Sequence, residues 1–472
     1  MCAAPKPVRV GNNSTNRPPW LGAHNRSSRL VGPCVMLSTT TPNQEKDCAA
    51  SLLLKGHTAP VLCLASWEDK WLASGSEDGT ARLWAPETSD PLRLTLQCER
   101  EVQAIALCPR SAVEIEKSPS RDDVGTGASP SLPSSTNHLP VVMLLFACDN
   151  TLFAYDLSNA TAENEPLSPI EVSLESCQAL WQANDEINQI VWTTAPLPSI
   201  GPTTGSRKKK KKAGSTQYSS SSASLWIAAA DDAGQIWLAT APWQTNIPSH
   251  TTILTHSNEG ALCLTTALRK TVKGKLDVLT GGSDCRIMQW QVLSNSTAFK
   301  LTSQLLIDLQ SATAPEQSAG QPLWNPPMVH HITWINSDWA AAACGDGQVR
   351  LLQRTGGRWV LMAQVEHGAV PACAVAAAVH GGVETLTVDT PTATTILGTA
   401  GNDGILKLWN VESLVKDNPD QDLQETSPSL VRTIEHGPKP NAMITTSAKE
   451  GVMLWIADTT NNISGYFSRR QI

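Results

Sequence analysis

The sequence predicts an all-β protein built from repeated units of short strands, and three observations lead to this fold class. Short alternating apolar runs recur along the 472 residues and are separated by Asp-Gly and Asn-Asp-Gly turns, which supply the positive φ angles of tight hairpins. A histidine, a Ser or Thr, an aspartate and a tryptophan recur at fixed spacing. One such unit cannot bury its own apolar faces, so the copies are expected to stack radially.

The best-defined unit lies at residues 56–84 and reads GHTAPVLCLASWEDKWLASGSEDGTARLW. Ser74 lies four residues before Asp78, Trp84 lies six residues after it, and His57 stands at the head of the first strand. The same spacing recurs twice, with the members His256, Thr280, Asp284 and Trp290, and His367, Thr399, Asp403 and Trp409. Three such sets indicate a true internal repeat.

Weaker copies fill the rest of the chain and bring the number of units to seven. FACDNTLFAYD, AAADDAGQIWL, ACGDGQVRLL and LWIADTTNNISGYF keep an aspartate turn but lose the tryptophan position. The last unit ends short of its outer strand, and a short apolar strand at 51–55 precedes the first unit. We expect this strand to complete the last unit and hide the open edges. The first unit would then span about 56–95, and the last about 431–472 plus 49–55.

The Gly-His, Asp and Trp pattern resembles the WD40 repeat, whose blades are four-stranded sheets arranged as a β-propeller. The resemblance implies a seven-bladed propeller over residues 49–472. It also implies that the His, Ser or Thr, Asp and Trp of one blade form an internal hydrogen-bond relay. The three sets given above would then fasten blades and would have no chemical role.

The segments outside the repeats are polar. Residues 1–48 form a basic tail rich in Ser, Pro and Asn, and the composition fits either a disordered tail or an organellar transit peptide. We expect the tail, because no amphipathic arginine-bearing helix is visible. Polar insertions at about 109–139, 196–223, 310–322 and 413–430 are predicted to be loops.

One insertion carries a basic run formed by Arg207, Lys208, Lys209, Lys210, Lys211 and Lys212. The run fits a nuclear-import signal and equally a solvated loop without a specific partner. The chain has a formal net charge of −7, and no aromatic residues are interleaved with the run. Sequence-specific binding of nucleic acid is therefore not expected.

The chain contains 16 Trp but only 4 Phe and 3 Tyr. Trp324 and Trp339 lie outside the repeat signature and are candidates for contact with another protein. The 12 Cys contain no C-x-x-C pair, so we expect no metal site and no cofactor. Several lie in apolar runs, as buried free thiols do. No secretory signal and no bilayer-spanning run is visible, which predicts an intracellular protein, cytoplasmic or nuclear, without a membrane partner.

A Ser, a His and an Asp in one short segment suggest a hydrolase, but the repeats argue against an enzyme. A catalytic site is normally present once, whereas this set recurs in three units. The sequence also lacks a G-x-S-x-G elbow and a phosphate-binding glycine loop. We therefore predict a non-enzymatic scaffold that binds other proteins, as a monomer within a larger complex.

A more specific resemblance concerns a seven-bladed member of the family that is grouped with substrate receptors of the cullin-4 ubiquitin ligase. It is carried by stretches such as NDEINQIVW, THSNEGALCL and IEHGPKPNAM. It implies that the chain recruits substrates and contacts the cullin-4 adaptor. Such receptors often carry a Trp-Asp-x-Arg ending on one blade, and no blade here has it. The alternative is a nuclear or chromatin-associated scaffold that binds peptides.

Overall fold

The computed structural model describes residues 50–109, 142–158, 169–196, 223–240, 250–256, 260–270, 276–295, 298–309, 325–336, 338–355, 358–380, 394–411, 428–448 and 451–469. These residues all lie in the second of the two units into which the chain divides, Cys48–Ile472. The predicted tail at 1–48 and most of the four predicted insertions lie outside the described residues.

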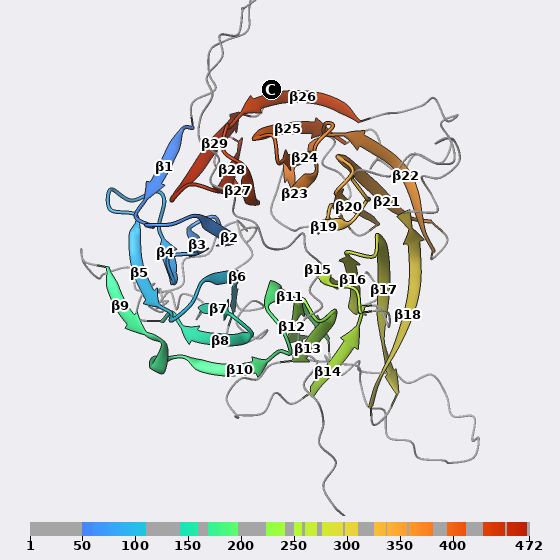
Figure 1. Cartoon of the computed structure of the whole chain (residues 1–472), viewed down its shortest axis with the longest axis horizontal. Coiled ribbons are helices and arrows are strands. Elements are labelled where there is room, and N and C mark those ends of the chain that lie inside the picture. The colour runs from blue at the N-terminus through green and yellow to red at the C-terminus, as the bar shows by residue number, and fades with distance from the viewer. Residues whose placement is uncertain are drawn as a thin grey trace, which may run out of the picture. The chain divides into compact units, whose positions relative to one another are not determined.

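Seven antiparallel sheets are arranged around a common centre as the blades of a propeller (Figure 1). Blade one contains β2 (Val61–Trp67), β3 (Trp71–Ser76), β4 (Thr80–Trp84) and β5 (Leu92–Gln97). Blade two contains β6 (Val102–Pro109), β7 (Val142–Cys148), β8 (Thr151–Asp156) and β10 (Gln178–Gln182). Blade three contains β11 (Ile187–Pro196), β12 (Ala223–Asp231), β13 (Gln235–Thr240) and β14 (His250–Thr255).

The second half of the ring repeats this plan. Blade four contains β15 (Cys263–Lys270), β16 (Leu276–Gly282), β17 (Arg286–Asn295) and β18 (Ala298–Asp308). Blade five contains β19 (Val329–Trp334), β20 (Trp339–Cys344), β21 (Gln348–Thr355) and β22 (Arg358–Glu366). Blade six contains β23 (Ala372–His380), β24 (Thr394–Gly401), β25 (Ile405–Asn410) and β26 (Ser429–Glu435). The seven-bladed all-β fold predicted from the repeats is thus confirmed.

Blade seven joins the two ends of the described chain. Its strands are β27 (Pro440–Ala448), β28 (Gly451–Asp458), β29 (Asn462–Arg469) and, as the outer strand, β1 (Leu52–Lys55). β1 pairs antiparallel with β29, and Leu54 is buried. The expected start of this blade at about 431 was wrong, because residues up to Glu435 pair with β25 as the outer strand of blade six. Residues 429 and 430 therefore also belong to a strand rather than to the insertion predicted over 413–430.

Apolar residues are buried between the blades. Seven clusters of buried apolar side chains are present, and each combines residues from two adjacent blades. The cluster between blades seven and one, for example, brings Leu54 and Trp455 against Leu72 and Trp84. A single blade lacks such a core, so radial stacking supplies the burial that the repeats need.

Two features depart from a regular four-stranded repeat. β9 (Ile170–Ser173) lies within the connection between β8 and β10. It pairs parallel with β5 and is the fifth strand, at the outer edge, of the sheet of blade one. It is followed by the 3-10 turn η1 (Leu174–Ser176).

Among the described residues no helix has the length and apolar character needed to cross a membrane.

All seven inner strands have a register shift at their second residue, where one residue is skipped in the pairing with the next strand. The skipped residues are Leu62, Gln103, Asn188, Leu264, His330, Cys373 and Asn441. Such bulges bend a strand and redirect its side chains. Here they place a ring of seven side chains at the same depth of the propeller.

The ring of bulges also connects neighbouring blades. The Asn188 side chain donates a hydrogen bond to the Cys263 carbonyl at 3.2 Å, and the Asn441 side chain donates to the Val61 carbonyl at 2.9 Å. In both cases the acceptor is the first residue of the next inner strand. The second bond joins blade seven to blade one and so reinforces the closure made by β1.

Candidate functional site

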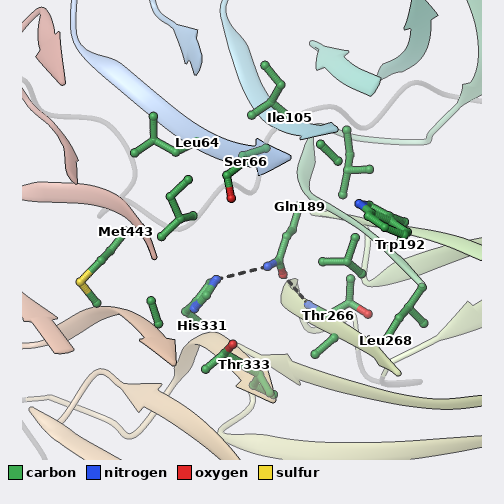
Figure 2. Close-up of a pocket in the computed structure, with 18 of the residues that line it drawn as sticks. Leu64, Ser66, Ile105, Gln189, Trp192, Thr266, Leu268, His331, Thr333 and Met443 are labelled. Carbon is green, nitrogen blue, oxygen red and sulfur yellow. Dashed lines mark hydrogen bonds between the residues drawn. The ribbon is translucent and has the colours of Figure 1, made fainter. Parts of the chain in front are cut away.

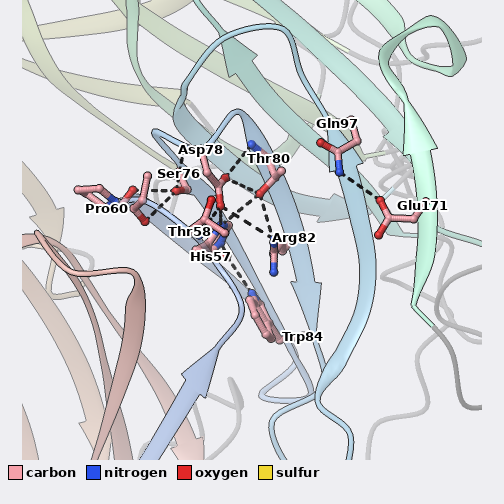
Figure 3. Close-up of polar contacts among 12 residues, drawn as sticks. His57, Thr58, Pro60, Ser76, Asp78, Thr80, Arg82, Trp84, Gln97 and Glu171 are labelled. Atoms are coloured by element: carbon pink, nitrogen blue, oxygen red, sulfur yellow. Dashed lines mark hydrogen bonds and ion pairs between the residues drawn. The ribbon is translucent and has the colours of Figure 1, made fainter.

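The four signature residues of blade one meet in a single chain of hydrogen bonds, and Figure 3 labels three of them, His57, Asp78 and Trp84. The Trp84 indole N–H donates to Ser74 Oγ at 2.8 Å, and Ser74 Oγ lies 2.7 Å from His57 Nε2. His57 Nδ1 lies 2.9 Å from a carboxylate oxygen of Asp78. With a neutral imidazole each group donates once to the next, from indole to hydroxyl to imidazole to carboxylate. These hydrogen bonds therefore link the connection before β2 to the turn between β3 and β4.

Blade four contains the same relay. His256 Nδ1 lies 2.7 Å from Thr280 Oγ1, its Nε2 lies 3.1 Å from Asp284, and the Trp290 indole donates to Thr280 at 3.3 Å.

The relay of blade six is looser at the aspartate. His367 Nδ1 lies 2.8 Å from Thr399 Oγ1, and Trp409 donates to the same oxygen at 3.0 Å. His367 Nε2 is 3.6 Å from Asp403, too far for a hydrogen bond, and has no other partner among the described residues. This relay thus lacks its last link.

A fourth relay escaped the sequence analysis. In blade seven His436 Nε2 lies 2.8 Å from Asp458, and its Nδ1 lies 2.7 Å from the Tyr466 hydroxyl. A tyrosine replaces both the Ser or Thr and the tryptophan, so the spacing used for the search did not apply. The His-Gly pair in IEHG could have indicated this relay in the sequence, although the repeat normally has the glycine before the histidine.

Three of the four relay histidines stand at one repeated position, directly after the outer strand of the preceding blade, whereas Gly56 separates His57 from β1. There the backbone N–H donates to the carbonyl of the preceding blade's turn: His256 to Gly234, His367 to Gly347 and His436 to Gly404, at 2.8–2.9 Å. The same bond runs from Cys98 N–H to Gly79 at 2.7 Å. Blade two therefore has a cysteine where blades four, six and seven have the relay histidine.

The geometry of Ser74, His57 and Asp78 is that of a hydrolase triad, but the nucleophile is sealed. Ser74 is 0% exposed and His57 only 3%. The Ser74 oxygen already accepts the Trp84 indole N–H. A substrate carbonyl cannot approach an oxygen covered in this way, because nucleophilic attack requires access to the reacting atom. Ser74 therefore acts as a link in a structural network.

The electrostatics agree with a structural network. Burial lowers the pKa of His57, although Asp78 opposes this effect, and so favours the neutral imidazole that the relay needs. Burial alone would raise the pKa of Asp78, but hydrogen bonds from His57 and Thr80 hold it well below its usual range. Hydrogen bonds from His256 and His436 lower the pKa values of Asp284 and Asp458 in the same way, against the effect of burial.

The seven inner strands line an open central channel (Figure 2). A chamber of about 180 Å³ lies among the bulge residues, on the side of the relay turns. A larger chamber of about 380 Å³ lies toward the other ends of the inner strands, where Trp192 and Trp334 contribute to the wall.

Gln189 and His331 line both chambers and interact across blades three, four and five. Gln189 Oε1 accepts the Thr266 N–H at 2.6 Å and the Thr265 hydroxyl at 2.8 Å, while its Nε2 lies 3.3 Å from His331 Nε2. An amide nitrogen can only donate, so His331 accepts at Nε2 and is neutral. Burial lowers the pKa of His331 to about 4, which fits this assignment.

The remaining candidate residues are placed differently. Trp339 is 2% exposed within the cluster between blades five and six, so the expectation of an exposed contact was wrong for this residue. Its strand, WAAAAC, is buried throughout, and Trp339 packs in a cluster with residues of blade six such as Val375. Trp324 and the run Arg207–Lys212 lie outside the described residues. No group of three or more metal-binding side chains occurs within the part of the chain that the structure describes.

Comparisons with known proteins agree with this architecture. The family model described as WD domain, G-beta repeat, matches residues 47–85. A ribosome biogenesis protein BOP1 homolog of Chlamydomonas reinhardtii is 39% identical over 67 residues, which is 14% of this chain. The match spans only 8% of that relative's length.

Among solved structures, the WD40 β-propeller domain of Doa1 superposes with a TM-score of 0.51 at 13% identity, over 90% of this chain and 97% of that one. Sqt1 of Saccharomyces cerevisiae has a TM-score of 0.49 at 11% identity, over 89% and 99% of the two chains. The repeat match at residues 47–85 and the seven blades lead to one conclusion: the chain folds as a seven-bladed β-propeller that contains a WD40 repeat.

Proposed function

We propose that the chain is a non-enzymatic protein-interaction scaffold that recruits substrates to a cullin-4-type ubiquitin ligase. The observation that carries the non-enzymatic part is the sealed triad, because Ser74 and His57 are buried and the same arrangement recurs in blade four. What the propeller offers to partners is then its two faces, its rim and the mouths of its channel.

The ligase role is supported by the resemblance of several stretches to WD repeat-containing protein 53. One of them, IEHGPKPNAM, includes His436, which holds the relay of blade seven. Another, NDEINQIVW, includes the channel residue Gln189. Because Trp84, Trp290 and Trp409 are followed by APE, QVL and NVE, no Trp-Asp-x-Arg ending is available, and the adaptor must be contacted through other residues.

A direct binding experiment tests this proposal. The purified full-length chain is titrated against the cullin-4 adaptor, and we expect a dissociation constant in the low micromolar range or tighter, as for specific transient complexes. A variant in which Lys208–Lys212 are replaced by Gly and Ser controls for nonspecific electrostatic attraction and should bind equally well. Absence of binding at about 10 μM adaptor would rule out the ligase role.

A second candidate function is that of a nuclear scaffold. It is favoured by the basic run Arg207–Lys212 and by the local similarity to a protein whose name refers to ribosome biogenesis. Imaging the chain with and without residues 207–212 is the first test, and exclusion from the nucleus after the deletion is expected. Purification of the intact chain from nuclei, followed by mass spectrometry, should then recover ribosome assembly factors. A distribution that is the same with and without the run would remove the main support.

A further inference from the structure

Blade two has one thiol at the position of the relay histidine and a second thiol at the end of its second strand. Cys98 stands at the repeated position of the relay histidine, and its backbone N–H bonds to the Gly79 carbonyl of blade one. Cys148 ends β7, and in the strand pairing it faces Val102, just as Ser76 faces Val61 in blade one. The two cysteines therefore lie on the face of the propeller that carries the relay turns.

Three further contacts place the segments of these cysteines side by side. The Cys148 thiol lies 3.6 Å from the Arg100 carbonyl, and the Arg100 side chain lies 3.7 Å from Asp149. Each of the two thiols, Cys98 and Cys148, shifts the pKa of the other, so the two side chains lie close enough to interact. Cys98 is half-buried and Cys148 is 6% exposed, so a small oxidant has to reach the pair from the side of Cys98.

We propose that Cys98 and Cys148 are a redox-active pair that a hydroperoxide converts to a disulfide joining the connection between blades one and two to the turn of blade two. The Cys148 thiolate attacks one peroxide oxygen, the O–O bond breaks, and water or an alcohol leaves. The Cys98 sulfur then attacks the Cys148 sulfenic acid and expels water as the S–S bond forms. Two thiols lose two protons and two electrons, and the peroxide is reduced.

The electrostatics of the pair suit this order of events. The interaction with Cys98 lowers the pKa of Cys148 to about 7, although burial opposes it, whereas the same interaction and burial raise that of Cys98. Cys148 is thus the sulfur that is ionised near neutral pH, and the thiolate is the reactive form. Burial raises the pKa of Cys63, Cys108, Cys263 and Cys344 far above the usual value of a thiol, so these thiols are expected to be inert.

The test is peptide mapping of the folded, full-length chain after treatment with one equivalent of hydrogen peroxide, without reduction. We expect one dominant linked pair of peptides that contains Cys98 and Cys148, with a mass lower by two hydrogens and reversal by dithiothreitol. Peroxide treatment of protein unfolded in urea should spread the links over many cysteines. A folded protein with no such link, or with links distributed as in the unfolded chain, overturns the proposal.

Variants separate the roles of the two sulfurs. In Cys98→Ser the sulfenic acid on Cys148 should persist and be trapped by dimedone, with at least a several-fold gain over the wild type. In Cys148→Ser dimedone labelling at Cys98 should be absent. Cys177→Ser is the matched control, because Cys177 is also half-buried near this cluster, and it should leave the Cys98–Cys148 link unchanged. A link from Cys98 to Cys177 in the wild type would contradict the assignment of the partner.

Discussion

The relay residues of a blade stabilise the fold because their buried polar atoms have hydrogen-bond partners. The stabilisation equals the free energy that is lost when a buried polar atom is left without its partner. In blade one His57 bonds at 2.7 Å and 2.9 Å on its two sides. Removal of the ring leaves the Ser74 hydroxyl hydrogen without an acceptor and takes one donor from Asp78, which keeps its bonds from Thr58 and Thr80. A buried group that loses its partner costs the full desolvation penalty. His367, the corresponding histidine of blade six, has a side-chain hydrogen bond at only one of its two ring nitrogens.

We therefore predict that His57→Ala lowers the free energy of unfolding by about 1–3 kcal/mol. His367→Ala, the matched variant, should cost less, because its Nε2 has no hydrogen-bond partner to release. Urea denaturation followed by tryptophan fluorescence measures both. Equal losses would show that the aspartate link contributes nothing, and an unchanged midpoint in His57→Ala would refute the structural role of the relay.

At the scale of the element, the turn between the second and third strands contains one residue with a positive φ in six of the seven blades. Gly404 has φ +73°, and a Cβ there would lie 2.2 Å from the Gly437 carbonyl of the next connection. Gly79 has φ +76°, but its Cβ would lie 3.1 Å from the Cys98 carbonyl. Cys285 takes the corresponding place in blade four with φ 61°, so a side chain is tolerated where space allows.

Gly404→Ala should therefore destabilise the protein more than Gly79→Ala. Both variants carry a backbone penalty of about 1 kcal/mol for the positive φ. Only Gly404→Ala adds a contact with backbone that cannot move aside, which should bring the loss above about 2 kcal/mol. Thermal melting of the two variants compares them directly. A larger loss in Gly79→Ala would contradict this account.

The closing strand β1 is the second element-scale feature with a testable consequence. β1 pairs with β29 over four residues, and Leu54 is buried against Trp455 and Trp84. Without β1, the backbone groups of β29 form an open edge that favours pairing between molecules. A chain that begins at Ala50 should melt within about 2 °C of the full-length chain, whereas one that begins at His57 should melt lower and form larger species.

Size-exclusion chromatography and thermal melting distinguish these two truncations. If the chain that begins at His57 remained monomeric and equally stable, the closure of blade seven by β1 would have no energetic role. The single substitution Leu54→Asp tests the same contact without removing backbone, and it should lower the melting temperature while the strand pairing remains possible.

At the scale of the whole molecule, several buried histidines make stability depend on pH. Burial lowers the pKa of His57, His330, His331 and His367 below the value of about 6.5 in the unfolded chain. The unfolded state therefore binds more protons than the folded state between these pKa values. Stability is fully present above about pH 6.5 and is lost as the pH falls toward the folded pKa values.

We predict that the free energy of unfolding decreases steadily from pH 7 to pH 5. His331, with its pKa at about 4, contributes a slope of up to about 1.4 kcal/mol per pH unit in that range. His331→Gln removes this proton while an amide oxygen can still accept from Gln189, and it should flatten the profile by about one proton. Urea denaturation at several pH values gives the slopes. Identical slopes in the two proteins would show that His331 does not titrate differently on folding.

Local patterns in the sequence were sufficient for the architecture. The fixed spacing around Asp78, Asp284 and Asp403 reflects contacts within one blade, where strand pairing makes distance along the chain translate into distance in space. Seven units, their stacking and the pairing of the first strand with the last unit all follow from such patterns and from the need to bury apolar faces. The relay around His436 was missed because its tyrosine lies outside the spacing.

Only the tertiary structure decided what happens between blades. The burial of Trp339, the ring of bulge residues around the channel, the contact of Gln189 with His331 and the approach of Cys98 to Cys148 join segments whose separation in the sequence depends on loop lengths. Such contacts have no fixed spacing, because the curvature and closure of the ring set them. The sequence by itself thus determined the blades and their number, and the closed ring determined which side chains are sealed and which face the channel.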